Sequence, residues 1–371
     1  MEQNQDYRVC AQCVMDTTDS NITFDESGVC NHCDDYWNRK RSMLNHPTER
    51  KAALDKLVVK IKNAGANKQY DCIIGVSGGI DSSYVVYLAK ELGLRGLLVH
   101  LDNGWNSELA VKNIENLVLY SGFDLYTVVI DWEEFKDLQR SFFKSDVIDL
   151  ELLSDHAIFA TVYKLAKQFG TKYLLSGENF ETEAVMASSW NWRKSDKINI
   201  KAIHKRFGTR RLKTFPFMST ARKLFYNKIG VAISIPILNF VDYDKDTAIE
   251  VLENKVGWKY YGGKHFESIF TRFYQGYILP NKFSVDKRRA HLSTLINSGR
   301  ISREDALREL SEPPYPLHLQ EQDRALVCKK LNFSDAEFSE YMSRPEVPHD
   351  NYGTDTAIYN ALLRLNRFLS K

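Results

Sequence analysis

The sequence has no apolar run long enough to cross a membrane; its longest apolar stretches, such as residues 231–238, have the length of a β-strand. The first residues, Met1 to Asp6, are polar and acidic, unlike a secretory signal peptide. A large charge of one sign is missing too, because 50 Lys and Arg face 48 Asp and Glu. These absences predict a cytoplasmic protein without membrane insertion, and they make nucleic acid an unexpected partner.

Cysteine is scarce, and four of the six cysteines form two Cys-x2-Cys pairs with sixteen residues between the pairs. This spacing is typical of a zinc ribbon or knuckle, in which four thiolates close a structural tetrahedral site. Residues 1–50 have few large aliphatic side chains, so a bound ion would supply stability that a core cannot. Four unrelated thiols, an iron–sulfur site, or a site with His32 as one ligand are the alternatives. The predicted zinc ligands are Cys10, Cys13, Cys30 and Cys33.

From residue 51 onward, strand-length apolar runs alternate with segments whose apolar residues recur at helical spacing. This alternation predicts a mostly parallel sheet covered by helices on both faces, and right-handed crossovers make it a doubly wound, Rossmann-like α/β domain. The expected strands are 71–76, 96–100, 125–130, 172–176 and 231–238, and the expected helices are 47–64, 82–92, 107–120, 132–143, 155–169 and 245–256.

The character of the sequence changes near Trp258, after which helix-like segments are separated by proline-rich breaks. We therefore expect three domains: a zinc-binding module with four cysteine ligands over 1–50, a nucleotide-binding domain over 51–256, and a smaller, mainly helical domain over 257–371. The expected helices of the last domain are 264–277, 287–298, 303–310 and 355–369.

The segment Ser77–Ser83 reads Ser-Gly-Gly-Ile-Asp-Ser-Ser, and it lies between the first expected strand and the next helix. Backbone N–H groups and the positive end of a helix bind anions in such a place. Gly78 and Gly79 let the backbone approach phosphate closely, while Asp81 could hold Mg²⁺. A plain Ser/Gly turn that caps an ordinary helix is the alternative. The expected hydroxyl donors are Ser77, Ser82 and Ser83.

This loop resembles the pyrophosphate-binding loop (PP-loop) of the N-type ATP pyrophosphatases, which have an adenine nucleotide alpha hydrolase-like fold. Those enzymes transfer AMP from ATP to a substrate oxygen and release pyrophosphate. Asp102-Asn103-Gly104 is similar to their second nucleotide-contacting segment. Gly177-Glu178-Asn179 is similar to a further loop over the nucleotide. The resemblance implies ATP and Mg²⁺ at Ser77–Ser83, with Asp102, Gly177, Glu178 and Asn179 around them.

The second half resembles the N-acetyl sugar amidotransferases (WbpG-like) of bacterial lipopolysaccharide and surface-glycan synthesis. The similar segments are Tyr260–Ser268, Phe270–Tyr277 and Lys282–Ser293. The resemblance implies an enzyme that adenylates an acetamido group on a nucleotide-linked sugar, of the UDP-diacetamido-uronic acid type. Ammonia then replaces the oxygen to give an acetamidino group, with release of AMP.

Within these segments, polar side chains are candidates for contacts with substrate or ATP phosphates. We expect Lys287 and Arg288 to act with Asp81 in catalysis, and Lys264, His265 and Arg272 to bind substrate. A helix surface with ion pairs is the alternative, since Lys264 and Glu267 are three residues apart.

A basic run between Trp192 and Lys213 contains nine Lys and Arg residues and one acid, Asp196. It is either a solvated face or a lid over a polyanionic substrate, and the sequence does not decide between them.

At neutral pH most ammonia in solution is protonated to ammonium. The resemblance therefore implies that a glutaminase supplies the ammonia. The chain has no N-terminal cysteine, and Cys72 and Cys328 lie in no nucleophile motif. We therefore expect a separate partner that resembles the histidine-pathway glutaminase with its barrel subunit. A tRNA-thiolating enzyme and a non-catalytic ATP-binding zinc protein are the alternative functions.

Overall fold

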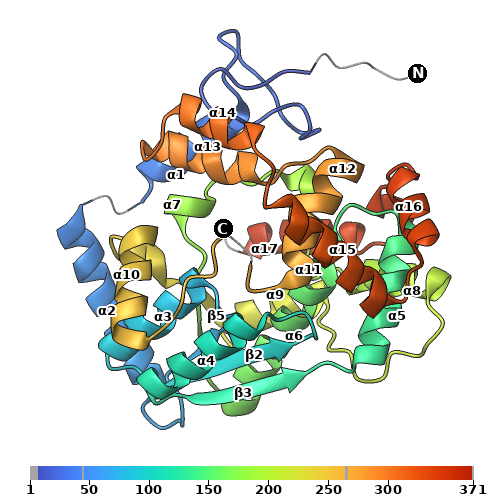
Figure 1. Cartoon of the computed structure of the whole chain (residues 1–371). Helices are drawn as coiled ribbons and strands as arrows, with labels where there is room; N and C mark the ends of the chain where they lie inside the picture. Colours follow the sequence, from blue (N-terminus) through green and yellow to red (C-terminus); the bar gives the residue numbers. More distant parts are fainter. Residues whose placement is uncertain (1–6, 44–45, 264–265, 370–371) are drawn as a thin grey trace.

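A computed structural model describes residues 7–43, 46–263 and 266–369, with side chains to residue 364 (Figure 1). Its centre is a sheet of five parallel strands in the order β3-β2-β1-β4-β5. Strand order reverses between β1 and β4, so the sheet is doubly wound as predicted. The strands are β1 (Cys72–Gly75), β2 (Gly96–Asp102), β3 (Asp124–Val129), β4 (Tyr173–Ser176) and β5 (Ile233–Pro236).

Successive residues of β1 face opposite sides of the sheet, and both sides are buried. Ile74 packs into a core with helices α2, α3, α4 and α10, whereas Ile73 packs into a second core with α6. Burial of both faces explains why β1 is a continuous apolar run. The covering helices are α2 (Pro47–Gly65), α3 (Ile80–Glu91), α4 (Glu108–Ser121), α6 (Leu152–Phe169) and α10 (Lys245–Val256).

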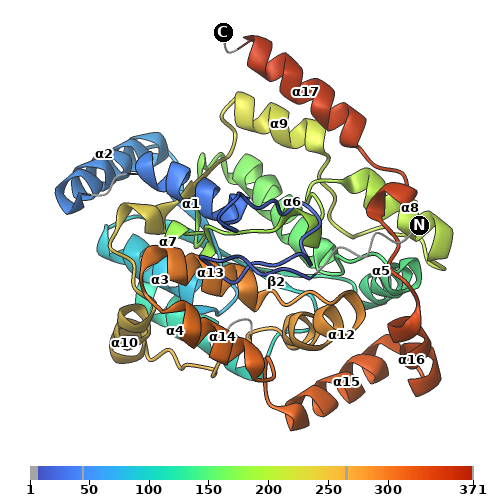
Figure 2. The same cartoon turned by 90° about the horizontal axis from the view of Figure 1, so that it is seen from above.

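A second layer of short helices lies over the carboxyl ends of the strands, next to the N-terminal segment (Figure 1). It includes α1 (Asn31–Arg41), α7 (Phe180–Glu183), α13 (Arg288–Ser298) and α14 (Arg303–Ser311). The remaining helices flank these two layers, and α17 lies beside α9 (Figure 2). They are α5 (Trp132–Ser145), α8 (Lys197–Phe207), α9 (Thr220–Lys228), α11 (Ile269–Phe273), α12 (Leu279–Phe283), α15 (Leu317–Leu331), α16 (Asp335–Ser343) and α17 (Thr356–Leu369).

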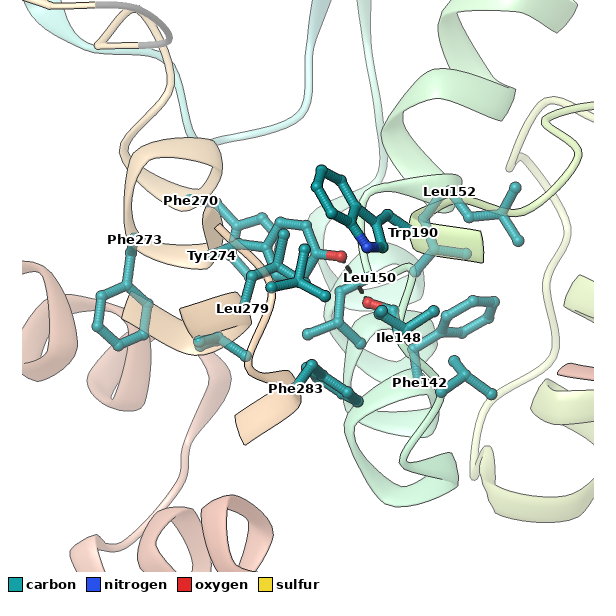
Figure 3. Close-up of a cluster of buried hydrophobic side chains, with 14 of the residues drawn as sticks. Phe142, Ile148, Leu150, Leu152, Trp190, Phe270, Phe273, Tyr274, Leu279 and Phe283 are labelled. Carbon is teal, nitrogen blue, oxygen red and sulfur yellow. Dashed lines mark hydrogen bonds between the residues drawn. The ribbon is translucent and has the colours of Figure 1, made fainter. Parts of the chain in front are cut away.

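The largest buried cluster takes residues from each of the three expected domains. It contains the four knuckle cysteines, aromatic residues of α5, and the segment 270–285. Figure 3 shows Phe270 and Tyr274 facing Leu150 and Trp190, with a hydrogen bond from the Tyr274 hydroxyl to the Ile148 carbonyl oxygen. The domain boundaries stay predictions, and the helical C-terminal segments share a core with the middle of the chain.

Most expected elements differ from the structure by one to three residues at an end, and two differ in character as well. The helix expected over 264–277 begins only at Ile269, where the Ser268 side chain caps α11, and Tyr274–Ile278 forms a π-helical turn. The strand expected over 231–238 ends at Pro236 and passes into a 3-10 turn. The helices without a counterpart among the expected elements are α1, α7, α8, α9, α12, α15 and α16.

Among the described residues, no helix is both long and apolar enough to span a bilayer.

Candidate active site

A cavity of about 1150 Å³ lies at the carboxyl ends of β1 and β2, under the second layer of helices. A smaller one of about 90 Å³ adjoins it at the start of α3. Open α/β sheets bind ligands at such a point, where the strand order reverses. Six residues line both cavities and mark their junction: Ser77, Thr182, Glu183, Lys245, Glu267 and His291.

The loop Ser77–Ser83 lies between β1 and the first turn of α3, as the sequence predicted, and its geometry requires glycine at position 78. Gly78 has a φ of +80°, and a Cβ there would lie 2.5 Å from the Ala110 carbonyl oxygen. Gly79 is the N-cap of α3 and offers no side chain to its first N–H groups. The Ile80 N–H is bound by the Tyr261 hydroxyl, but the positive end of α3 as a whole faces the small cavity, where it would attract an anion.

The three serines of the loop occupy different environments. Ser77 is exposed and faces both cavities, and its hydroxyl lies 3.3 Å from that of Ser82. Ser82 donates to the Gly79 carbonyl oxygen at 3.2 Å. Ser83 is fully buried, and its hydroxyl has no hydrogen-bond partner among the described residues. Only Ser77 thus presents its hydroxyl to the cavities without a change of rotamer.

Asp81 lies in the first turn of α3 and lines the small cavity. The Tyr243 hydroxyl donates to its Oδ1 atom. Burial and the negative charge of Asp81 both raise the pKa of Tyr243, so this hydroxyl keeps its proton. A Cβ on Gly177 would lie 2.9 Å from the Asp81 Cβ, so the loop after β4 packs directly against Asp81. This close approach gives Gly177 a steric role.

A segment from the second half of the chain closes over the phosphate loop. The Trp258 indole donates to the Gly78 carbonyl oxygen at 2.9 Å, and the Ile80 N–H donates to the Tyr261 hydroxyl at 3.1 Å. Burial, and next the charge of Glu267, raise the pKa of Tyr261. Sequence patterns gave these two aromatic residues no role, because their contacts join segments about 180 residues apart.

Lys245 and His291 were also missed as site residues. Lys245 begins α10 and lines both cavities opposite the loop, and within the described ranges it has no carboxylate partner. His291 lines both cavities from α13 and donates through Nδ1 to the Thr182 carbonyl oxygen at 2.9 Å. The sequence signals were weak: Lys245 is the first residue of a helix after the fifth strand, and His291 lies in the segment Lys282–Ser293 that carries the family resemblance.

The expected nucleotide-contacting segments lie near the site, but several of their side chains already form hydrogen bonds within the protein. Asp102 accepts from the Gly104 N–H at 2.9 Å, and its neighbours Asn103 and Asn106 line the cavity. Asn179 is buried and caps α7 through the Thr182 N–H at 2.9 Å. Glu178 is exposed and lines neither cavity.

The expected catalytic residues Lys287 and Arg288 and the expected substrate residue Arg272 differ in how many bonds they already make within the protein. Lys287 lines the large cavity and pairs with Glu151 at 3.3 Å. Arg272 forms a bidentate pair with the buried Asp323, at 2.7 and 2.8 Å. Arg288 pairs with Asp286 and donates to backbone carbonyls of α14 and the residue after it. Lys287 therefore has the fewest fixed bonds of the three. Lys264 and His265 lie outside the described residues.

The basic run divides between the cavity and the surface. Lys194 lines the cavity between Asp149 and Asp155, at 2.7 and 3.0 Å. Burial alone would lower the pKa of Lys194, but these carboxylates outweigh it and raise the pKa. Arg193 also lines the cavity and pairs with Asp355. The later exposed residues are Lys201, Lys205, Arg206, Arg210, Arg211 and Lys213.

The four knuckle cysteines form a compact, buried cluster, as predicted. The Sγ atoms of Cys10 and Cys33 are 3.9 Å apart, and those of Cys13 and Cys30 are 3.6 Å apart. Four sulfurs at about 2.3 Å from a tetrahedral zinc ion would be about 3.8 Å apart. The Cys10 sulfur also accepts backbone N–H groups, including that of Cys30 at 3.2 Å. The cluster fits zinc, and all four ligand positions are taken.

Comparisons with known proteins agree with the expected family in the C-terminal part. Residues 267–366 match the model of the family described as LPS biosynthesis protein WbpG-like, C-terminal domain. The uncharacterized protein MJ1599 of Methanocaldococcus jannaschii is 23% identical over 85% of this chain and 97% of its own length. The tRNA(Ile)-lysidine synthase of Chlamydia pneumoniae is 39% identical over 72 residues, which are 18% of this chain and 23% of that protein.

Among solved structures, NMN synthetase from Francisella tularensis aligns over 60% of this chain and 99% of its own, with 16% identity and a TM-score of 0.30. A predicted tRNA methyltransferase subunit from Methanocaldococcus jannaschii aligns over 48% and 72%, with 16% identity and a TM-score of 0.27. Similarity at this level does not establish a shared function. The family match is the informative one: residues 267–366 are similar to the C-terminal domain of the WbpG-like LPS biosynthesis proteins.

Proposed function

We propose that this chain is an ATP-dependent amidotransferase that activates an acetamido group of a nucleotide-linked sugar by adenylation. The observation that carries the proposal is the junction of the two cavities. There, an anion-binding loop at the start of α3 meets a large cavity whose opposite wall is the WbpG-like segment. One substrate would bind through its phosphates at the loop, and the other would lie along the C-terminal wall.

The chemistry follows from the poor leaving group of an amide. The acetamido oxygen attacks the α-phosphorus of ATP, the bond from that phosphorus to the bridging oxygen breaks, and pyrophosphate leaves. Ammonia then adds to the carbon of the resulting imidate, AMP departs with the original oxygen, and one proton is lost. The product is an acetamidine in its protonated form. No protein nucleophile is needed, so positioning and charge stabilisation account for the catalysis.

The loop residues have roles that fit this reaction. The N-terminus of α3, Ser77 and Lys245 would hold the β- and γ-phosphates. Asp81, oriented by the Tyr243 hydroxyl, would bind the Mg²⁺ that accompanies ATP and shields its phosphate charge. Lys287 lines only the large cavity, where the acceptor would lie, whereas His291 stands at the junction and could contact either substrate.

Ammonia would come from a separate glutaminase, of the kind that acts with a barrel subunit. Cys72 is buried in β1, and burial raises its pKa. Burial also raises the pKa of Cys328. Neither thiol lines either of the two cavities at the site, so neither has the activated environment of a glutaminase nucleophile there. The same observation disfavours a tRNA-thiolating enzyme, which would need a reactive cysteine beside the nucleotide.

The direct test is to incubate the protein with ATP, ammonium chloride and UDP-linked acetamido sugars, and to analyse the products by mass spectrometry. Replacement of oxygen by NH lowers the mass of the sugar nucleotide by about one unit while ATP becomes AMP and pyrophosphate. Formation of ADP and orthophosphate would contradict the adenylation step. Acceptor-independent ATP binding without any turnover would favour the non-catalytic alternative.

A further inference from the structure

The four-cysteine knuckle, residues 7–33, lies behind segments that line the cavity. No described residue of the knuckle lines either cavity. Nevertheless, it contacts two segments that do, namely α13, whose N-terminal half lines the cavity, and the stretch 185–191. The knuckle is thus placed directly behind one side of the cavity wall.

The contacts to α13 are polar and specific. The Arg289 guanidinium donates to the Val14 carbonyl oxygen at 2.8 Å and pairs with Asp16 at 2.8 Å. The Val14 N–H donates to the Ser293 hydroxyl at 3.2 Å. The Asn297 amide donates to the Cys33 sulfur at 3.7 Å, and sulfur would be a zinc ligand. These residues project from α13 toward the knuckle, while Lys287 and His291 project from the same region into the cavity.

The contacts to 185–191 come from the loop between the two cysteine pairs. Asp19 accepts from the Ser189 hydroxyl at 2.6 Å, and the Trp190 indole donates to the Thr18 carbonyl oxygen at 3.2 Å. Asp19 also pairs with His32 at 2.6 Å, which ties this loop to α1. Trp190 is 2% exposed and lines the cavity.

The two segments held by the knuckle also bind each other. The Val185 N–H donates to the Thr294 hydroxyl at 3.0 Å, and the His291 ring donates to the Thr182 carbonyl oxygen. By contrast, the phosphate loop is held by residues outside the knuckle, including Trp258 and Tyr261. We infer that the metal-bound knuckle positions the cavity wall formed by α13 and 185–191, along which the acceptor would lie. The phosphate loop, by contrast, forms without the knuckle.

This inference does not depend on which acceptor the protein uses, so it can fail while the proposed function stands. Arg289, Ser293 and Asn297 are positioning residues in this scheme, because they act through the wall they hold. Zinc in the knuckle would fix the backbone around the cysteines, from which Val14 and Asp16 project.

The first test compares the metal-bound protein with the EDTA-treated protein by hydrogen–deuterium exchange. Removal of the metal should raise exchange about tenfold or more in 180–192 and 286–298, and leave 72–91 unchanged. A rise confined to 7–43 would overturn the inference, as would purified protein that contains no metal. If EDTA unfolds the whole chain, the following variant decides.

Arg289→Ala removes the bridge to Val14 and Asp16 but no predicted metal ligand. Zinc content by mass spectrometry and the affinity for α,β-methylene-ATP should stay within about twofold, while exchange rises in 286–298 and in 180–192. Arg308→Ala is the matched control, because the Arg308 side chain is 74% exposed on α14 and its ion pair is with Asp305 of the same helix. Unchanged exchange in both wall segments of Arg289→Ala would overturn the inference.

Discussion

The phosphate loop and the opposite wall of the cavity are built in different ways. The loop is a single segment of seven residues whose shape is set by two glycines and the helix that follows. The wall is assembled from 182–194, α13 and parts of the C-terminal region, and ion pairs hold its charged side chains. A local motif needs only correct backbone geometry, whereas an assembled wall needs each supporting contact.

The largest effect is expected from Asp81→Ala. Loss of the carboxylate at the start of α3 should lower pyrophosphate release on the order of 1,000-fold, because the phosphate charge loses its metal shielding. Zinc content should not change, since the knuckle is a separate cluster. Tyr243→Phe keeps the carboxylate and removes one hydrogen bond, so a loss of about tenfold is expected. Pyrophosphate release by Asp81→Ala at the normal rate would refute this role.

The next effect is expected from Lys245→Ala, which removes the lysine at the junction of the cavities. The kcat/KM for ATP should fall about 100-fold, because a charge-assisted contact to phosphate is lost in a partly buried site. Lys255→Ala, on the exposed last turn of the same helix, is the matched control. Equal activities of the two variants would show that Lys245 does not contact the phosphates of ATP.

The smallest expected effect is a loss of stability at acid pH, in the region of the assembled wall. Burial lowers the pKa of His156, and also of His349, to about 4. The neutral His156 ring donates to the Lys194 carbonyl oxygen at 2.7 Å and accepts from the Met218 N–H at 3.2 Å. Below pH 6.5 these histidines become protonated in the unfolded chain, whereas in the folded protein they stay neutral down to about pH 4. Stability is therefore complete above pH 6.5 and falls between pH 6.5 and 4.

At pH 5 each of these histidines should cost about 2 kcal/mol of unfolding free energy. Urea unfolding at pH 7 and pH 5 measures the difference. His156→Gln should lessen the pH dependence, whereas His318→Gln, on the surface of α15, should preserve it. If both variants keep the full pH dependence, the buried histidines do not control the acid response.

Sequence patterns predicted the loop and the sheet well because both depend on neighbouring residues. Gly78 was expected to let the backbone approach phosphate; the structure shows another reason for glycine there, a positive φ and a close approach to the Ala110 carbonyl oxygen. The four cysteines were found by spacing, and their sulfurs converge. Arg272 was predicted as a substrate residue and Arg288 as a catalytic residue, but the sequence did not show that their guanidinium groups pair with Asp323 and Asp286.

By itself, the sequence determined the doubly wound sheet, the phosphate loop and the cysteine cluster. Each of these follows from short-range rules: apolar periodicity, the conformational freedom of glycine, and the ligand geometry of a metal. Only the tertiary structure decided which charges are paired, that Lys245 and His291 meet the loop, and that the knuckle lies behind α13. The physical reason is that these contacts join residues far apart in the chain, and their partners are selected by packing.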